Sequence, residues 1–168
     1  MIRIFAFLLL TISAWAQPGE EYLPSAFPKV KLFRVFQPDR GEVLKGIEVD
    51  GNLFSPAQTG EASQAGLATC GWKEADSKGR EKLALAWCSQ VMLGGRTLLY
   101  KTPADFPAGK QNFQPPLATT EADGLVHVRI WTLPEGGNVV RRVSLYSRLH
   151  WVFTQQGRIS EAVVRQDR

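Results

Sequence analysis

The sequence predicts an all-β fold on three observations. Residues 125–164 alternate apolar and polar side chains over two successive runs, a pattern typical of half-buried antiparallel strands. Two shorter runs, 30–36 and 43–49, are rich in β-branched and aromatic residues and flank the turn sequence 38–41. Turn signals recur along the chain at intervals of about 8 to 12 residues. We expect a single-domain antiparallel β-sandwich or partly closed barrel of about seven or eight strands, with room for one short helix within residues 55–93.

Residues 1–16 have the composition of a secretory signal peptide. Arg3 precedes an apolar run over residues 4–12, and Ala14–Ala16 forms a small-x-small cleavage signal. The apolar run is too short for about 30 Å of hydrocarbon, which needs about 20 residues. We therefore expect cleavage before Gln17, a periplasmic or secreted protein, and no transmembrane segment in the mature chain.

The mature chain divides into an arm and a domain. Residues 17–28 contain three prolines and predict an extended N-terminal arm, and residues 29–168 predict a single β domain. Within the domain, 30–36 and 43–49 predict a first hairpin, and 50–52 predict the turn that follows it.

Residues 55–93 allow two interpretations. Residues 55–68 are small and polar and predict a long loop that could contain a short helix. The pattern that follows favours strands over 66–72 and 82–93, with a turn into another strand over 96–101. The alternative is a helix over 77–93, where good helix formers cluster, and the sequence leaves this choice open.

Cys70 and Cys88 are the only cysteines. Because an export signal implies an oxidising compartment, we expect a Cys70–Cys88 disulfide. It would close a loop of about 19 residues and contribute roughly 3 kcal/mol in the chain-entropy model. Two cysteines with no histidine nearby make a poor zinc site. No metal and no cofactor is predicted.

The run over 125–164 predicts a hairpin with its tip at Gly136–Gly137. Trp131 would then face Arg142, and His127 would face Tyr146. A proline-rich irregular crossover is expected before it, over residues 102–123.

The last predicted strand spans residues 158–164, after a three-residue turn that ends in glycine. Its expected pairs are Phe153 with Ile159 and Leu149 with Val163, with Glu161 opposite Trp151 on the apolar side.

Positive charge gathers in the same C-terminal region. From Leu125 onward there are seven arginines and three acids, a net charge of +4, whereas the rest of the mature chain has a net charge of −1. Arginine beside aromatic rings suits an anionic partner, an envelope protein or an anionic glycan. Nucleic acid is discounted because of export. The predicted binding residues share the outward face of the hairpin: His127, Arg129, Trp131, Arg142, Tyr146 and Arg148.

No strong catalytic signature occurs in the sequence. The H-E-x-x-H, G-x-S-x-G, P-loop and S-x-x-K patterns are all missing from it. The two histidines, His127 and His150, are expected on the outward face but well apart, and simply solvated. A catalytic carboxylate pair would be spatial rather than sequential, so the sequence cannot reveal one.

Three functional hypotheses follow. The first is an exported, non-enzymatic binding or assembly protein of a bacterial cell envelope, acting through the basic-aromatic face or an edge strand. The second is a carbohydrate- or peptidoglycan-binding module. The third is a hydrolase with an unrecognised carboxylate pair. Fold alone does not choose among them.

Overall fold

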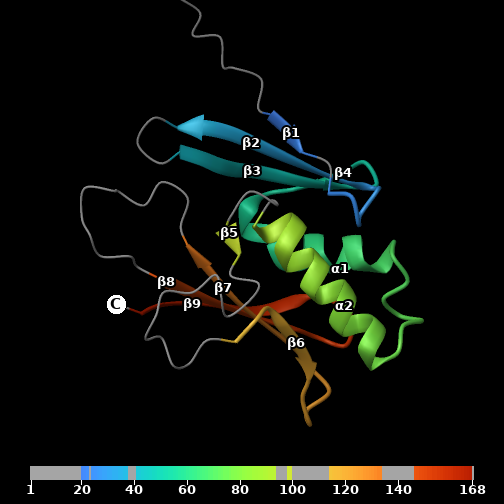
Figure 1. Cartoon of the computed structure of the whole chain (residues 1–168). Coiled ribbons are helices and arrows are strands. Elements are labelled where there is room, and N and C mark those ends of the chain that lie inside the picture. The colour runs from blue at the N-terminus through green and yellow to red at the C-terminus, as the bar shows by residue number, and fades with distance from the viewer. Residues whose placement is uncertain are drawn as a thin grey trace, which may run out of the picture.

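The computed structural model of the chain describes residues 20–22, 24–37, 41–93, 98–99, 114–133 and 146–167. These residues form two antiparallel sheets with helices between them (Figure 1). The prediction of an all-β fold is confirmed in part: the described residues are mostly β but also form two α-helices, and the sheets do not close into a barrel. The predicted signal peptide, residues 1–16, lies outside the described residues.

The first sheet has the strand order β1-β2-β3-β4. The predicted hairpin is confirmed as β2 and β3, and Asp50 and Gly51 both have positive φ in the tight turn that leads to β4. Part of the predicted N-terminal arm joins this sheet, because β1 pairs with β2. The strands are β1 (Glu20–Tyr22), β2 (Val30–Gln37), β3 (Gly41–Val49) and β4 (Asn52–Phe54).

The second sheet has the order β5-β7-β8-β9, and β6 also pairs with β7. The strand β6 falls within the predicted irregular crossover, where two threonines give a short β-prone stretch that pairs with β7. Most of the remaining crossover lies outside the described residues. The strands are β5 (Leu98–Leu99), β6 (Leu117–Thr120), β7 (Val126–Leu133), β8 (Tyr146–Phe153) and β9 (Ile159–Asp167).

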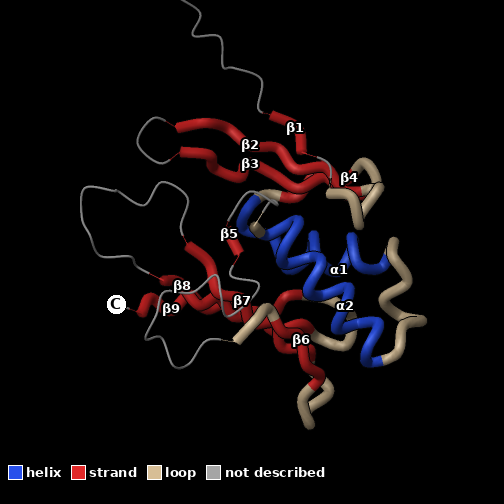
Figure 2. The backbone as a smooth tube through the Cα atoms, viewed as in Figure 1, coloured by secondary structure: helices blue, strands red, loops and turns tan. Residues whose placement is uncertain are grey.

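The segment between the sheets is helical, so the strands predicted over 66–72 and 82–93 are wrong. A 3-10 turn, η1 (Pro56–Gln58), leads into α1 (Thr59–Ala68). Then α2 (Ser77–Trp87) continues as the π-helical turn η2 (Cys88–Met92). The Asp76 carboxylate caps α2 by accepting a 2.7 Å hydrogen bond from the Gly79 amide. Figure 2 shows both helices between the two sheets, and none of the described helices has the length and apolarity to cross a bilayer.

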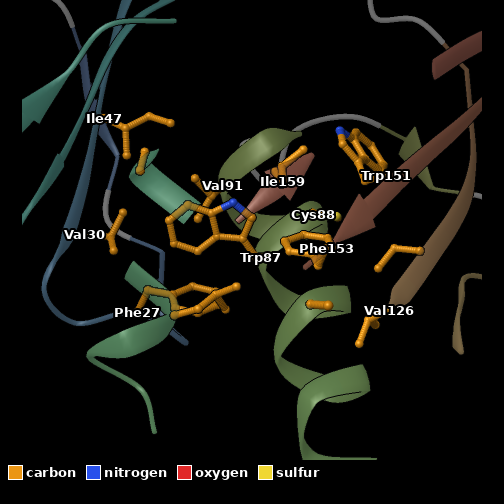
Figure 3. Packing of buried hydrophobic residues seen from close by; sticks show 14 of the residues in the cluster. Phe27, Val30, Ile47, Trp87, Cys88, Val91, Val126, Trp151, Phe153 and Ile159 are labelled. Carbon is orange, nitrogen blue, oxygen red and sulfur yellow. The ribbon is translucent and has the colours of Figure 1, made fainter. Parts of the chain in front are cut away.

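One buried apolar cluster joins both sheets to the helices. Trp87 packs edge-on against Phe27 with ring centroids 5.1 Å apart, and it lies between side chains of the first sheet and Phe153 of the second (Figure 3). Trp72 donates a 2.9 Å hydrogen bond to the Gln155 carbonyl, which ties the turn after α1 to the turn between β8 and β9. Each such buried aromatic side chain stabilises the fold by about 1.5–3 kcal/mol through burial alone.

The predicted Cys70–Cys88 disulfide is not formed. Both cysteines are free thiols; Cys88 is fully buried in η2, and Cys70 is half-buried in the turn after α1. The predicted strands over 66–72 and 82–93 would each carry one cysteine, whereas this segment is helical. Burial raises the pKa of the Cys88 thiol well above its ordinary value of 9.0.

The register of β7 and β8 differs from the predicted one. Trp131 lies opposite Arg148, six residues further along than the predicted partner Arg142. The predicted tip at Gly136–Gly137 implies a two-residue turn, whereas the connection comprises residues 134–145, which lie outside the described residues. Because the shift is an even number of residues, each side chain stays on its predicted face.

A β-bulge makes the register between β8 and β9 differ from the predicted one. Phe153 pairs with Ile159 as predicted, but the register then shifts by one residue. Glu161 therefore lies opposite Val152 rather than Trp151, and Leu149 lies opposite Val164 rather than Val163. The bulge removes Glu161 from the core-facing side of the sheet.

Candidate functional site

The outward face of the second sheet carries four of the six predicted binding residues. His127, Arg129 and Trp131 project from β7, and Arg148 projects from β8 on the same face. Arg142 lies outside the described residues. Tyr146 begins β8, and its side chain is not among those described.

Arg129 is already matched by a carboxylate. Its Nη2 donates a 2.6 Å hydrogen bond to Glu121 Oε1, and its Nη1 lies 3.4 Å from Thr119 Oγ1. The Arg129 guanidinium holds the pKa of the Glu121 carboxyl below its usual value. Arg129 therefore braces the β6–β7 turn and has little free charge for a ligand.

His127 and His150 form a direct pair, so the prediction that they lie well apart is wrong. His127 Nδ1 is 3.0 Å from His150 Nε2, and the rings stack with centroids 5.2 Å apart. The true register brings this about, since it places His150 opposite Arg129 and diagonal to His127. Burial, and then the positive charge of Arg129, lower the pKa of His150.

Two carboxylates lie beyond His127. Its Nε2 is 3.7 Å from Glu121 Oε2 and 3.9 Å from Asp123 Oδ2. These distances are too long for hydrogen bonds, and Nε2 is buried without one. Within the described ranges, no group of three or more His, Cys, Asp or Glu side chains is arranged to hold a metal ion.

The histidine pair does not line the cavity that the structure forms nearby. That cavity, of about 170 Å³, lies between the start of α2 and the turns of the second sheet. Its walls come from core-facing and turn residues: Trp72, Ser77, Arg80, Thr120, Gly124, Val126, Thr154 and Gln155. The pair can pass a proton between rings, but this cavity does not bring a substrate to it.

Trp131 is not an open stacking platform. Only 8% of it is exposed, and the Arg148 Cζ lies 5.9 Å from the centre of its ring. Stacking on sugars or bases requires an accessible ring face. Of the two aromatic residues Trp131 and Tyr146 on the predicted basic-aromatic face, Trp131 is therefore buried, and the Tyr146 side chain is not among those described.

The outer edge of β9 is a second feature of this surface. Helix α1 covers only its start, where the Ile159 amide donates a 2.9 Å hydrogen bond to Ser63 Oγ. From Ser160 onward, no strand in the described part of the chain pairs with this edge. Val164 is 62% exposed although it lies on the core-facing side, opposite Leu149. A long free edge with an exposed apolar side chain is a template for strand pairing.

Two arginines meet beside this edge without a carboxylate. Arg148 lies directly opposite Arg165 on the outward face. In the described residues neither forms an ion pair, whereas Arg129 and Arg158 each bind a glutamate, at 2.6 and 2.7 Å. Like charges directly opposite one another destabilise a sheet. An anion at this position would offset that repulsion.

The last strand could be predicted from the sequence, but its position at the edge of the sheet could not. Ala162-Val163-Val164 puts apolar side chains on both faces, a pattern typical of a strand that is covered on both faces. That β9 is outermost follows only from the sheet order.

A scan against protein-family models and searches of curated proteins and solved structures found no match to this chain.

Proposed function

We propose that this chain is an exported, non-enzymatic binding protein of a bacterial cell envelope that holds an acidic, extended segment of a partner protein along β9. The observation that carries the proposal is the edge of β9, which from Ser160 onward pairs with no strand in the described residues, beside Arg148 and Arg165, which form no ion pair among those residues. Strand addition supplies affinity through backbone hydrogen bonds and specificity through alternate side chains.

The edge is favoured over the open face because of what each offers a partner. The face offers Trp131, which is 8% exposed, and Arg129, whose charge is matched by Glu121. The edge offers backbone groups that no strand in the described ranges pairs with, the exposed side chain of Val164 and the charge of Arg165. A planar guanidinium binds a carboxylate through two parallel hydrogen bonds. The partner segment should therefore carry an acidic residue at the position opposite Arg165.

The proposal includes the predicted setting of the protein. Removal of residues 1–16 would release the chain into the periplasm or the medium. Residues 29–168 would then form one sandwich-like β domain, with α1 and α2 between its two sheets.

Site-specific photo-cross-linking in envelope extracts tests the proposal. A benzoylphenylalanine at Val164 should cross-link to a polypeptide segment that contains acidic residues. The matched control is the same probe at Leu53, which is 69% exposed but lies on β4 of the other sheet. Cross-links to glycan, or equal cross-linking from both positions, would contradict an acidic protein segment as the partner.

A further inference from the structure

The sequence of β9 is complementary to itself when the strand is reversed about Val163. Ala162 then faces Val164, and Glu161 faces Arg165. In an antiparallel pair, residues directly opposite each other have side chains on the same face, and opposite charges there stabilise the pair. We propose that β9 pairs antiparallel with β9 of a second copy of this chain, about a two-fold axis at Val163.

Neighbouring registers lack this complementarity. In a β-strand, the backbone groups of alternate residues point to the same edge. A symmetric antiparallel pair of identical strands therefore has its two-fold axis at one residue, which faces its own copy. An axis at Val164 would place Glu161 opposite Asp167, a second acidic residue. An axis at Ala162 would place Glu161 opposite Val163. Among these three registers only the axis at Val163 sets each glutamate against an arginine.

The pairing also brings a carboxylate to Arg148 and Arg165, which lie opposite each other on the outward face. Glu161 and Arg165 lie on the same face of the sheet as Arg148. The incoming Glu161 of the second copy would lie next to Arg165, which itself lies opposite Arg148. A carboxylate would thus arrive beside two guanidinium groups that have no acidic partner in the described part of the chain.

The core-facing side gains apolar contact at the same time. Val164 is 62% exposed, and Ala162 beside it is also exposed. In the paired edge each Val164 would pack against Ala162 of the other copy, so apolar surface leaves water on both copies.

Helix α1 sets the length of the paired segment. Its residues Gly60 and Ser63 cover the backbone of Ile159, since a Cβ added at Gly60 would lie only 2.7 Å from the Ile159 carbonyl oxygen. Pairing therefore involves residues 160–166, which in this register face one another and end before the helix.

This inference rests on the proposed function, since it uses the same edge and names the occupant as a second copy. The two can fail separately. If the protein is monomeric and a probe at Val164 cross-links to another polypeptide, the dimer is contradicted and the proposed binding function is supported. If the protein is a dimer and the probe at Val164 cross-links only to the second copy, the dimer is supported and binding of a different protein is contradicted.

Charge reversal tests the register in the full mature chain by sedimentation equilibrium. We expect a dissociation constant in the micromolar range for so small an interface. Glu161→Arg and Arg165→Glu should each weaken dimerisation by about tenfold or more, because each sets like charges opposite one another twice per dimer. The double variant Glu161→Arg/Arg165→Glu should restore it, and an equimolar mixture of the two single variants should form a heterodimer. Glu74→Arg, exposed in the turn after α1, is the charge-matched control and should leave the dissociation constant unchanged.

Two results would overturn the inference. One is a wild-type chain that stays monomeric throughout the concentration series. The other is a double variant that dimerises no better than either single variant, since the pairing partners would then not be Glu161 and Arg165. Circular dichroism on each variant establishes that the fold is retained.

Discussion

His127 and His150 meet across β7 and β8, with His127 Nδ1 3.0 Å from His150 Nε2. One ring must donate this hydrogen bond and the other accept it, so the pair is best satisfied when it is not doubly protonated. The charged groups around it are Arg129, Glu121, Asp123 and Glu161.

The pair makes stability depend on pH. The pKa of His150 in the folded chain lies below its ordinary value of 6.5, chiefly because of burial. Because the unfolded chain then binds more protons, the stability that neutral His150 contributes is fully present above pH 6.5. It is lost as the pH falls through the folded pKa. His150→Gln should flatten this fall. Urea unfolding at about pH 8 and about pH 5.5 measures it, and an equal loss in both proteins would contradict the prediction.

The contact between α1 and α2 requires a glycine at position 66. A Cβ added at Gly66 would overlap the six-membered ring of Trp87. We expect Gly66→Ala to destabilise the fold by about 1–3 kcal/mol, measured by urea denaturation. Trp87→Phe removes the overlapping ring atoms, so the double variant should lose less than the sum of the two single variants. Strict additivity would show that the two side chains do not meet.

Glu81 ties α2 to β6. Its Oε1 accepts a 2.8 Å hydrogen bond from the Thr120 amide, and its Oε2 lies 2.8 Å from Lys78 Nζ. Glu81→Ala should cost about 1–3 kcal/mol by leaving that amide unpaired, and Glu81→Gln should cost less because its oxygen can still accept. The hydrogen bond from Lys78 holds the pKa of Glu81 below its ordinary value of 4.5. The stabilisation that depends on the charge of Glu81 is therefore present above pH 4.5 and is lost as the pH falls through the folded pKa. Thermal denaturation of both variants at neutral and acid pH checks this, and a Glu81→Gln loss equal to that of Glu81→Ala would contradict it.

The two thiols should differ in reactivity. Cys88 is fully buried and its pKa is raised by burial, so the native chain should shield it from alkylation. Cys70 is only half-buried and should react first. Iodoacetamide labelling followed by peptide mass spectrometry measures both rates, with urea-unfolded chain as the control. A native chain in which neither thiol reacts until a reductant is added would instead indicate the disulfide.

The local elements were the predictable part of the fold. The β2–β3 hairpin could be predicted because short turns and β-branched residues specify it within about 20 residues of chain. The helix α2 corresponds to the alternative over 77–93, which the local pattern could not favour over a strand although its residues are good helix formers. It buries Ala84 and Trp87 between two sheets, and those sheets are not visible in the local pattern.

For the candidate site, the sequence could predict only the face of the sheet on which each side chain lies. Alternation placed His127 and Arg129 on the correct side of β7, because side-chain parity survives an even shift in register. Which residues meet across β7 and β8 depends on the connection over 134–145, whose length does not by itself fix the register. Hence the pairing of His127 with His150, and the place of β9 at the edge, required the three-dimensional structure.

Disulfide trapping at the proposed two-fold axis tests the central claim most directly. Residues at that axis face their own copies with Cα atoms about 4.5–5.5 Å apart, a separation that a disulfide spans. The background is Cys70→Ser/Cys88→Ala, and Val163→Cys is compared with Ser160→Cys, which would lie roughly 20 Å from its copy. Mild oxidation should convert the Val163→Cys chain to a covalent dimer and leave the Ser160→Cys chain monomeric on a non-reducing gel. Equal dimer from both variants, or none from Val163→Cys, would contradict pairing through β9 in this register.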